Sequence, residues 1–256
     1  MIYRYATKIA ATLIALITTA AYAVDIKVVS SGGFAQTYEE LAPIFAMQTD
    51  NRLYFTRSFS SGASNNSIPM RLDRGEDIDV VIMTGSPLDE LMDKGKLLPG
   101  SKVQLASSLI ACAVKHGEPR LDISTATKLK SVLLNAKSMA YSNGASGNYI
   151  KNDLMSALGI KEQMASKLKL TPAKPVGDVI ASGEVQMGCQ QLSELTAVKG
   201  VDIIGLLPQE LQLITPFYGA VTTTSKVPNQ ARDLLIFLKS PANNHLYEKN
   251  GLTPAN

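Results

Sequence analysis

The sequence predicts an α/β fold in which a mostly parallel sheet carries helices on both faces. Short β-branched runs alternate with runs of helical periodicity. The 256 residues are enough for one large core or two smaller ones. Several of the apolar runs end in turns rich in serine, glycine and asparagine.

The first half of the chain shows the alternation clearly. Leu41, Ile44 and Phe45 recur at helical spacing, and Ser67 near Pro69 is typical of a helix start. The expected elements are strands at 25–30, 53–59 and 79–84, and helices at 37–49, 67–75 and 88–95.

The second half continues the pattern. Ala231, Leu234, Leu235 and Leu238 lie on one face of a helix near the end of the chain. The expected elements are strands at 106–115, 138–142, 185–190 and 213–224, and helices at 148–159, 175–183 and 229–240.

The first 23 residues have the features of a secretory signal peptide. Arg4 and Lys8 precede an apolar run at 9–17, and the sequence AYA at 21–23 suits signal peptidase. The run is shorter than the ~20 residues of a membrane span, although an N-terminal anchor is the alternative. We expect cleavage after Ala23, a periplasmic mature chain of 233 residues and no membrane insertion afterwards.

Charge and histidine content exclude several kinds of partner. Removal of the first 23 residues leaves 23 basic and 22 acidic side chains, which argues against nucleic acid. His116 and His245 stand far apart and have no cysteine or histidine at metal-site spacing. We expect no metal and no cofactor.

Cys112 and Cys189 each lie within an apolar run. An oxidising compartment permits a disulfide between them, and two separate buried thiols are equally compatible with the sequence.

Small polar residues gather at four of the expected strand ends, at 30–33, 60–64, 84–86 and 142–147. Ligands of such sheets bind beyond the carboxyl ends of the strands, and helix N-termini favour anions. Each turn alone is also compatible with ordinary capping.

Ser146 raises the alternative of a serine hydrolase. Its surroundings, GASGN, depart from the G-x-S-x-G elbow at Asn148, and only His245 follows as a base. We therefore expect no catalytic residues, with hydrolysis through Ser146 as the disfavoured alternative.

Five segments together resemble the periplasmic substrate-binding proteins of ABC transporters, in the molybdate-binding group. They cover nearly all of the mature chain and are VVSSGGFAQTYEELAPIF, SIPMRLDRGEDIDVVIMTG, AYSNGASGNYIKNDLMSALGI, PVGDVIASGEVQMGCQQLSEL and ARDLLIFLKSPANNHLYEKNGLTPA.

The resemblance implies two doubly wound α/β lobes joined by two crossing strands, with the ligand in a cleft between them. Lobe one would comprise residues 24–108 plus 220–256, and lobe two residues 109–219. Binding would close the cleft by a hinge motion.

The resemblance also implies a set of ligand-binding positions. In the first loop the matching serine is Ser30 or Ser31, and in the second loop the spacing leaves the register of the matching serine open. At the short helix the match is Val176 or Gly177. The expected residues are Ser30, Ser31, Gly32, Ser61, Gly62, Ser64, Asn65, Ala145, Ser146, Gly147, Val176, Gly177, Gln190 and Gln191.

Two departures leave the ligand open. Molybdate binders of this group often have a tyrosine where this chain has Gln191. Arg57 and Arg71 would pair with a carboxylate if either faced the cleft, whereas a snorkelling or structural arginine is the alternative. The candidates are a molybdate-like oxyanion and a small organic carboxylate.

The expected function is capture of a small anion for ABC-type import, without catalysis. The partner would be the membrane permease, and the protein would be a monomer. A periplasmic sensor that presents the bound anion to a receptor is the alternative.

Overall fold

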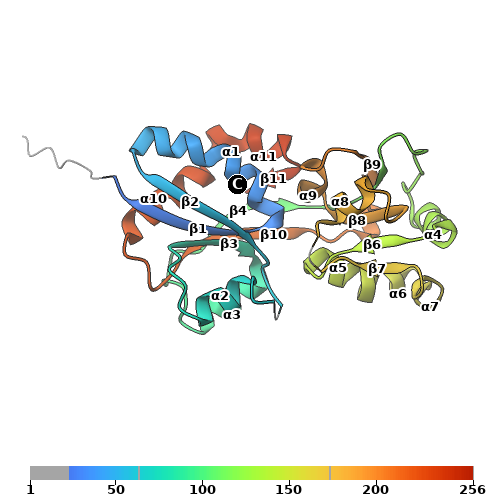
Figure 1. Ribbon diagram of the computed structural model, residues 1–256, viewed down its shortest axis with the longest axis horizontal. Coiled ribbons are helices and arrows are strands. Elements are labelled where there is room, and N and C mark those ends of the chain that lie inside the picture. Colours follow the sequence, from blue (N-terminus) through green and yellow to red (C-terminus); the bar gives the residue numbers. More distant parts are fainter. Residues whose placement is uncertain (1–22, 63, 173, 256) are drawn as a thin grey trace, which may run out of the picture.

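The computed structural model describes residues 23–62, 64–172 and 174–255. The predicted signal peptide therefore lies outside the described residues, apart from Ala23. Figure 1 shows two α/β lobes side by side, each built on its own sheet. In the described ranges, no helix is long and apolar enough to cross a membrane.

The first lobe is built on a six-stranded sheet in the order β11-β4-β10-β3-β1-β2. Its strands are β1 (Asp25–Ser31), β2 (Arg52–Ser58), β3 (Val80–Thr84), β4 (Val103–Ser108), β10 (Thr215–Val221) and β11 (Leu252–Pro254).

Helices cover both faces of this sheet (Figure 1). One face packs against α1 (Gly32–Thr49), α10 (Pro228–Lys239) and α11 (Asn244–Lys249), and the short η3 (Pro241–Asn243) connects the last two. The other packs against α2 (Ile68–Asp73) and α3 (Gly85–Asp93). Each face has its own buried cluster, centred on Phe34, Tyr38 and Phe217 or on Ile68, Met83 and Leu88.

The second lobe is built on a five-stranded sheet in the order β7-β6-β8-β5-β9. Its strands are β5 (Ile110–Lys115), β6 (Met139–Tyr141), β7 (Leu168–Leu170), β8 (Met187–Gln191) and β9 (Val201–Leu206).

This sheet is also covered on both faces. One cluster involves α4 (Ala126–Asn135), α5 (Ala145–Tyr149), the π-helical η1 (Ile150–Leu154), α6 (Met155–Ala157) and α7 (Lys161–Met164). The other involves α8 (Val176–Ala181) and α9 (Leu192–Thr196), while η2 (Gln209–Leu211) follows β9.

The predicted α/β fold with two lobes is confirmed, but the expectation of mostly parallel sheets is wrong. Parallel pairing is limited to β1 with β2 and β3, and to β6 with β7 and β8. Strand β10 runs antiparallel to β3 and β4, and β5 runs antiparallel to β8 and β9. Parallel neighbours are usually joined by a helix that crosses over the same sheet. Strands at which the chain passes from one lobe to the other are not joined in this way.

The chain crosses between the lobes at two adjacent places. The single long strand expected at 106–115 divides at Leu109 into β4 and β5. The return crossing leads from η2 into β10, where Thr215 pairs with Ser108. Because β10 begins at Thr215, residues 215–219 belong to the first sheet and not, as expected, to lobe two.

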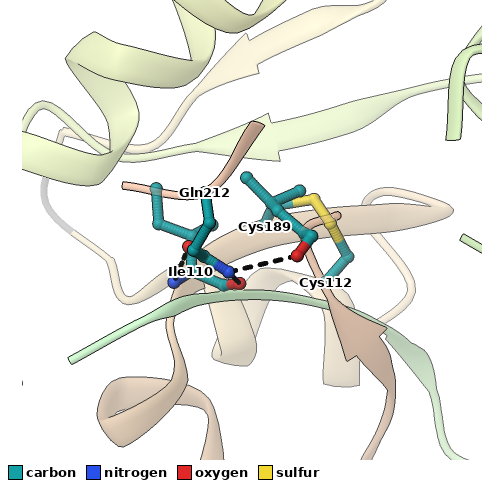
Figure 2. Close-up of a disulfide and its surroundings, with 5 residues drawn as sticks. Ile110, Cys112, Cys189 and Gln212 are labelled. Atoms are coloured by element: carbon teal, nitrogen blue, oxygen red, sulfur yellow. Dashed lines mark hydrogen bonds between the residues drawn. A yellow bond between two sulfur atoms is a disulfide. The ribbon is translucent and has the colours of Figure 1, made fainter. Parts of the chain in front are cut away.

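A disulfide joins Cys112 of β5 to Cys189 of β8 (Figure 2). The two residues face each other across the antiparallel pair, with their Cα atoms 4.0 Å apart, and both are fully buried. This pairing replaces the alternative of two separate thiols. Nearby, the Gln212 side chain donates to the carbonyl of Ile110 at 3.0 Å and accepts from its N–H at 2.7 Å. The start of β5 is thus fixed from both sides.

We expect loss of the disulfide to lower the free energy of unfolding by about 2–4 kcal/mol, because the bridge closes a loop across 77 positions of the unfolded chain. Urea unfolding should show this difference between the oxidised protein and the Cys112→Ala/Cys189→Ala variant. Reductant should destabilise the wild type and leave the variant unchanged. A variant as stable as the oxidised wild type would contradict the prediction.

Candidate functional site

A cleft of about 540 Å³ lies between the two lobes, where β1, β2, β3, β6 and β8 reach their carboxyl ends. Both lobes contribute to its lining. From the first lobe come Ser31, Gly32, Gly33, Gln36, Arg57, Ser58, Phe59, Ser60, Asn66, Thr84 and Phe217. From the second come Ser142, Asn143, Gly144, Ala145, Ser146, Thr171, Lys174, Pro175, Asp178, Gln190, Gln191, Glu194, Ala197, Val198 and Lys199.

Seven of the sixteen residues singled out in the sequence lie at this cleft. The residues placed there are Ser31, Gly32, Arg57, Ala145, Ser146, Gln190 and Gln191. Their role in binding a ligand stays a prediction.

Ser30 and the second-loop residues lie elsewhere. Ser30 is fully buried at the end of β1, and its hydroxyl donates to the carbonyl of Ser31. Alternation along β1 turns successive side chains to opposite faces, so only Ser31 reaches the cleft. Ser61, Gly62, Ser64 and Asn65 lie beyond the lining, which this loop supplies through 58–60 and Asn66.

The remaining predicted residues have structural positions. Val176 and Gly177 are buried inside the second lobe, while Lys174, Pro175 and Asp178 face the cleft. Arg71 is buried on α2 and pairs with Glu76, so it is not a cleft arginine.

Gly147 shapes the cleft without lining it. A Cβ atom at this position would lie 1.7 Å from the carbonyl oxygen of Ser142. Its absence lets the 142–146 segment fold tightly over the start of α5, which brings Ser146 to the cleft.

Three buried polar atoms at the cleft have no hydrogen-bond partner among the described residues. They are Ser31 Oγ, Gln190 Oε1 and Gln191 Oε1. Buried polar atoms are nearly always hydrogen-bonded, so unpaired ones that border a cleft indicate a place for a ligand or ordered water. The amide of Gln191 is held from behind, because its Nε2 donates to Thr215 Oγ1 at 2.7 Å.

Glu194 is a carboxyl group in the cleft that the sequence analysis did not single out. It accepts a hydrogen bond from the side-chain amide of Gln190. Its carboxyl lies against the first turn of α1, with one oxygen 3.3 Å from where a Cβ of Gly32 would be. Burial raises the pKa of Glu194 from its ordinary value of 4.5 to about 7, and the charge of Arg57 opposes this shift.

Three cationic residues of the described chain line the cleft, namely Arg57, Lys174 and the exposed Lys199. Arg57 lies near the end of β2, is about half exposed and pairs with Glu39 at 3.4 Å. Lys174 precedes α8 and donates to Glu184 at 3.0 Å. Exposed pairs of this kind are weak, so either cation can exchange its partner for an anionic ligand.

The geometry gives no support to catalysis through Ser146. His245 lies on α11 and is not part of the cleft lining, and its ring nitrogen is 3.0 Å from the carbonyl of Ala242. Within residues 23–62, 64–172 and 174–255, no group of three or more His, Cys, Asp or Glu side chains is arranged to hold a metal ion.

A sequence signal existed for the missed residues. Glu194 follows Gln191 on the short helix after β8, so the rule that ligands bind beyond strand ends applies to it as well. Lys174 likewise stands just before a helix start. Which of these polar side chains share one cleft depends on the packing of the two lobes.

We expect Gly147→Ala to lower the free energy of unfolding by about 1–3 kcal/mol, because the methyl group would overlap the Ser142 carbonyl. Gly144→Ala is the matched control, since its Cβ would meet only Ser142 Oγ at 3.5 Å. Urea unfolding of both variants measures the difference. Equal midpoints would mean that the 142–146 segment adjusts without cost.

The raised pKa of Glu194 predicts a pH-dependent stability. Between pH 4.5 and about 7 the folded protein keeps this proton while the unfolded chain has lost it. The free energy of unfolding should therefore fall as the pH rises through this window, by up to about 3 kcal/mol from Glu194.

Glu194→Gln should remove that part of the pH dependence, and Glu162→Gln on α7 should retain it. Urea unfolding at pH 5 and pH 8 compares the three proteins, and carboxyl NMR titration reads Glu194 directly. An unchanged slope in Glu194→Gln would contradict the prediction.

The chain resembles known proteins over most of its length. Residues 26–253 match the model of a family described as bacterial extracellular solute-binding protein. The chain is 42% identical over 227 residues to a protein of a Pseudomonas species named aconitate isomerase. The match covers 89% of this chain and 87% of the relative.

Solved structures support the same fold at low identity. The periplasmic molybdate-binding protein of Azotobacter vinelandii superposes with a TM-score of 0.73 at 18% identity, covering 90% of this chain and all of the other. The sulfate-binding protein SubI of Mycobacterium tuberculosis gives 0.70 at 16% identity, covering 91% and 88%. The chain belongs to the bacterial extracellular solute-binding protein family and has the fold of type II periplasmic binding proteins.

Proposed function

We propose that this protein binds a small organic tricarboxylate of the aconitate class in its cleft and interconverts isomers of that ligand. The observation that carries the proposal is the 42% identity, over 89% of the chain, to a protein named aconitate isomerase. Structural likeness to oxyanion-binding proteins lies at 18% identity or below for the two structures compared, so it supports the fold and not their ligands.

The chemistry of the cleft suits a carboxylate ligand. Arg57 and Lys174 supply positive charge at its edge, and a guanidinium can bind a carboxylate through two parallel hydrogen bonds. Ser31, Gln190 and Gln191 supply neutral groups with unpaired buried atoms. Together these cationic and neutral groups can bind several carboxylates of one ligand without contacting its carbon chain.

The presence of Glu194 favours an organic ligand over an inorganic oxyanion. An ionised carboxylate in the cleft would repel a compact dianion that must sit against it. A longer ligand can instead place its carboxylates near the cations and a carbon atom near Glu194.

The second candidate is capture of the same anion without chemistry, for delivery to an ABC transporter permease. The family description favours this candidate. In either case we propose that the protein is periplasmic and acts as a monomer. The alternative to the permease as a partner is a sensor, to which the protein would present the bound anion.

The first test is a thermal-shift panel of the mature protein with both aconitate isomers, citrate, smaller dicarboxylates, molybdate, tungstate, sulfate and phosphate. We expect stabilisation by aconitate, amounting to ~2.7 kcal/mol at 100 times the Kd. Proton NMR of each aconitate isomer incubated with the protein should then show the other isomer appearing. Binding without conversion would support the capture candidate. Stabilisation by inorganic oxyanions alone would overturn the tricarboxylate proposal.

Arg57 provides a second prediction. Arg57→Gln should raise the Kd for aconitate about tenfold, the loss of roughly 1.4 kcal/mol from one charged hydrogen-bonded contact. Arg232→Gln on α10, outside the cleft lining, is the matched control and should bind normally. Calorimetric titration measures both. An unchanged Kd for Arg57→Gln would mean that Arg57 does not bind the ligand and only pairs with Glu39.

A further inference from the structure

We propose that the carboxyl group of Glu194 is the catalytic acid–base group of the cleft, moving a proton between two carbon atoms of the bound tricarboxylate. This inference rests on the proposed isomerisation and adds the residue that performs it. A general acid or base must reach the ligand, hold its orientation and titrate near the working pH.

The position of Glu194 is central to the cleft. It projects from α9 in the second lobe and touches Gly32, the first residue of α1 in the first lobe. Its carboxyl is therefore at the contact between the lobes, where a ligand held by both lobes must also lie. The residue is partly buried and lines the cleft, so one side remains open to a ligand.

The orientation of Glu194 is fixed by Gln190, which lies four residues earlier in the chain on β8. The Gln190 amide donates to the carboxylate, and Gln190 itself is buried. Cys189 precedes Gln190 on β8, so the disulfide to β5 holds the strand that carries Gln190. A carboxyl oriented by a fixed neighbour is typical of a proton-transfer site.

Few other groups at the cleft are suited to the role. Asp178 is the other carboxylic acid in the described lining, and it is exposed on α8. Lys174 and Lys199 are exposed as well. The pKa of Glu194, raised to about 7 by burial, gives it both protonated and ionised forms near neutral pH.

The proposed step balances without any co-reactant. Aconitate has a CH₂ group next to a C=C bond. The Glu194 carboxylate takes one proton from the CH₂ carbon, and that C–H electron pair forms a new C=C bond to the central carbon. The old π pair then takes a proton from the Glu194 carboxylic acid at the far carbon. One C–H bond breaks, one forms, and Glu194 returns to its starting state.

The charged groups around Glu194 support this cycle. Arg57 on β2 and Lys174 before α8 can neutralise charge that spreads onto the ligand carboxylates as the proton leaves. Asp178 on α8 and Lys199 after α9 complete the charged lining in the described chain. The local balance is two lysines and one arginine against two acids, so an anionic intermediate is tolerated.

The test compares wild type with Glu194→Gln, which keeps the size and the amide contact of the side chain. Aconitate conversion is followed by proton NMR, and the Kd is measured separately by calorimetry. We expect kcat to fall at least about 100-fold in Glu194→Gln while the Kd changes only a few-fold. Glu162→Gln is the control and should retain wild-type kcat. The wild-type kcat should fall as the pH drops below the pKa of Glu194, because the base becomes protonated.

The outcomes separate the two proposals. Glu194→Gln with wild-type turnover would overturn the role of Glu194 and leave the isomerase function standing. Loss of binding equal to the loss of turnover would overturn it too, by making Glu194 a binding residue. A wild type that binds aconitate and converts neither isomer would remove the reaction and this role together. Glu194→Asp keeps a carboxyl group but shortens the side chain by one methylene. This variant should show partial turnover, and its kcat should still fall at low pH as in the wild type.

Discussion

The two adjacent crossings between the lobes are the constraint on which the rest of the structure depends. Ser108 pairs with Thr215 where β4 leaves the first sheet and β10 enters it, and Gln212 holds the start of β5 at Ile110. Since both crossings lie together, the lobes meet along one side and leave a cleft on the other. Both sheets contain antiparallel pairs at their crossing strands, β10 with β3 in the first lobe and β5 with β8 in the second.

The walls of the cleft are tied to these crossings by short polar contacts. The Gln191 amide donates to Thr215 Oγ1 at 2.7 Å, and the hydroxyls of Ser108 and Ser193 lie 3.3 Å apart. The end of β8, and the short helix after it, are thereby attached to the crossing strands. The disulfide between Cys112 and Cys189 fixes the same strand within its sheet. The glutamines and Glu194 consequently occupy a rigid part of the cleft.

A binding cleft and a catalytic cleft can share this architecture. Hydroxyl and amide groups hold an anion without reacting with it, because their pKa values lie far from neutrality. A single carboxyl shielded from water between two lobes changes the chemistry available, since its proton affinity rises into the neutral range. The glycine at the start of α1 makes room for that carboxyl, because any side chain at Gly32 would contact it.

The sequence alone determined the α/β alternation, the positions of many strands and helices and the importance of the polar turns, since these follow from local periodicity and turn chemistry. The two-lobed arrangement was implied by the resemblance of five segments to a known family. The division of 106–115 at Leu109, the pairing of the cysteines and the antiparallel strands were decided by the tertiary structure. The same holds for the site. Ser31 and Gln190 were predicted, whereas the choice of Asn66 over Asn65, and the placing of Glu194 against Gly32, depend on how the two lobes pack. Contacts between residues distant in the chain leave no periodic pattern, so only the folded structure contains them.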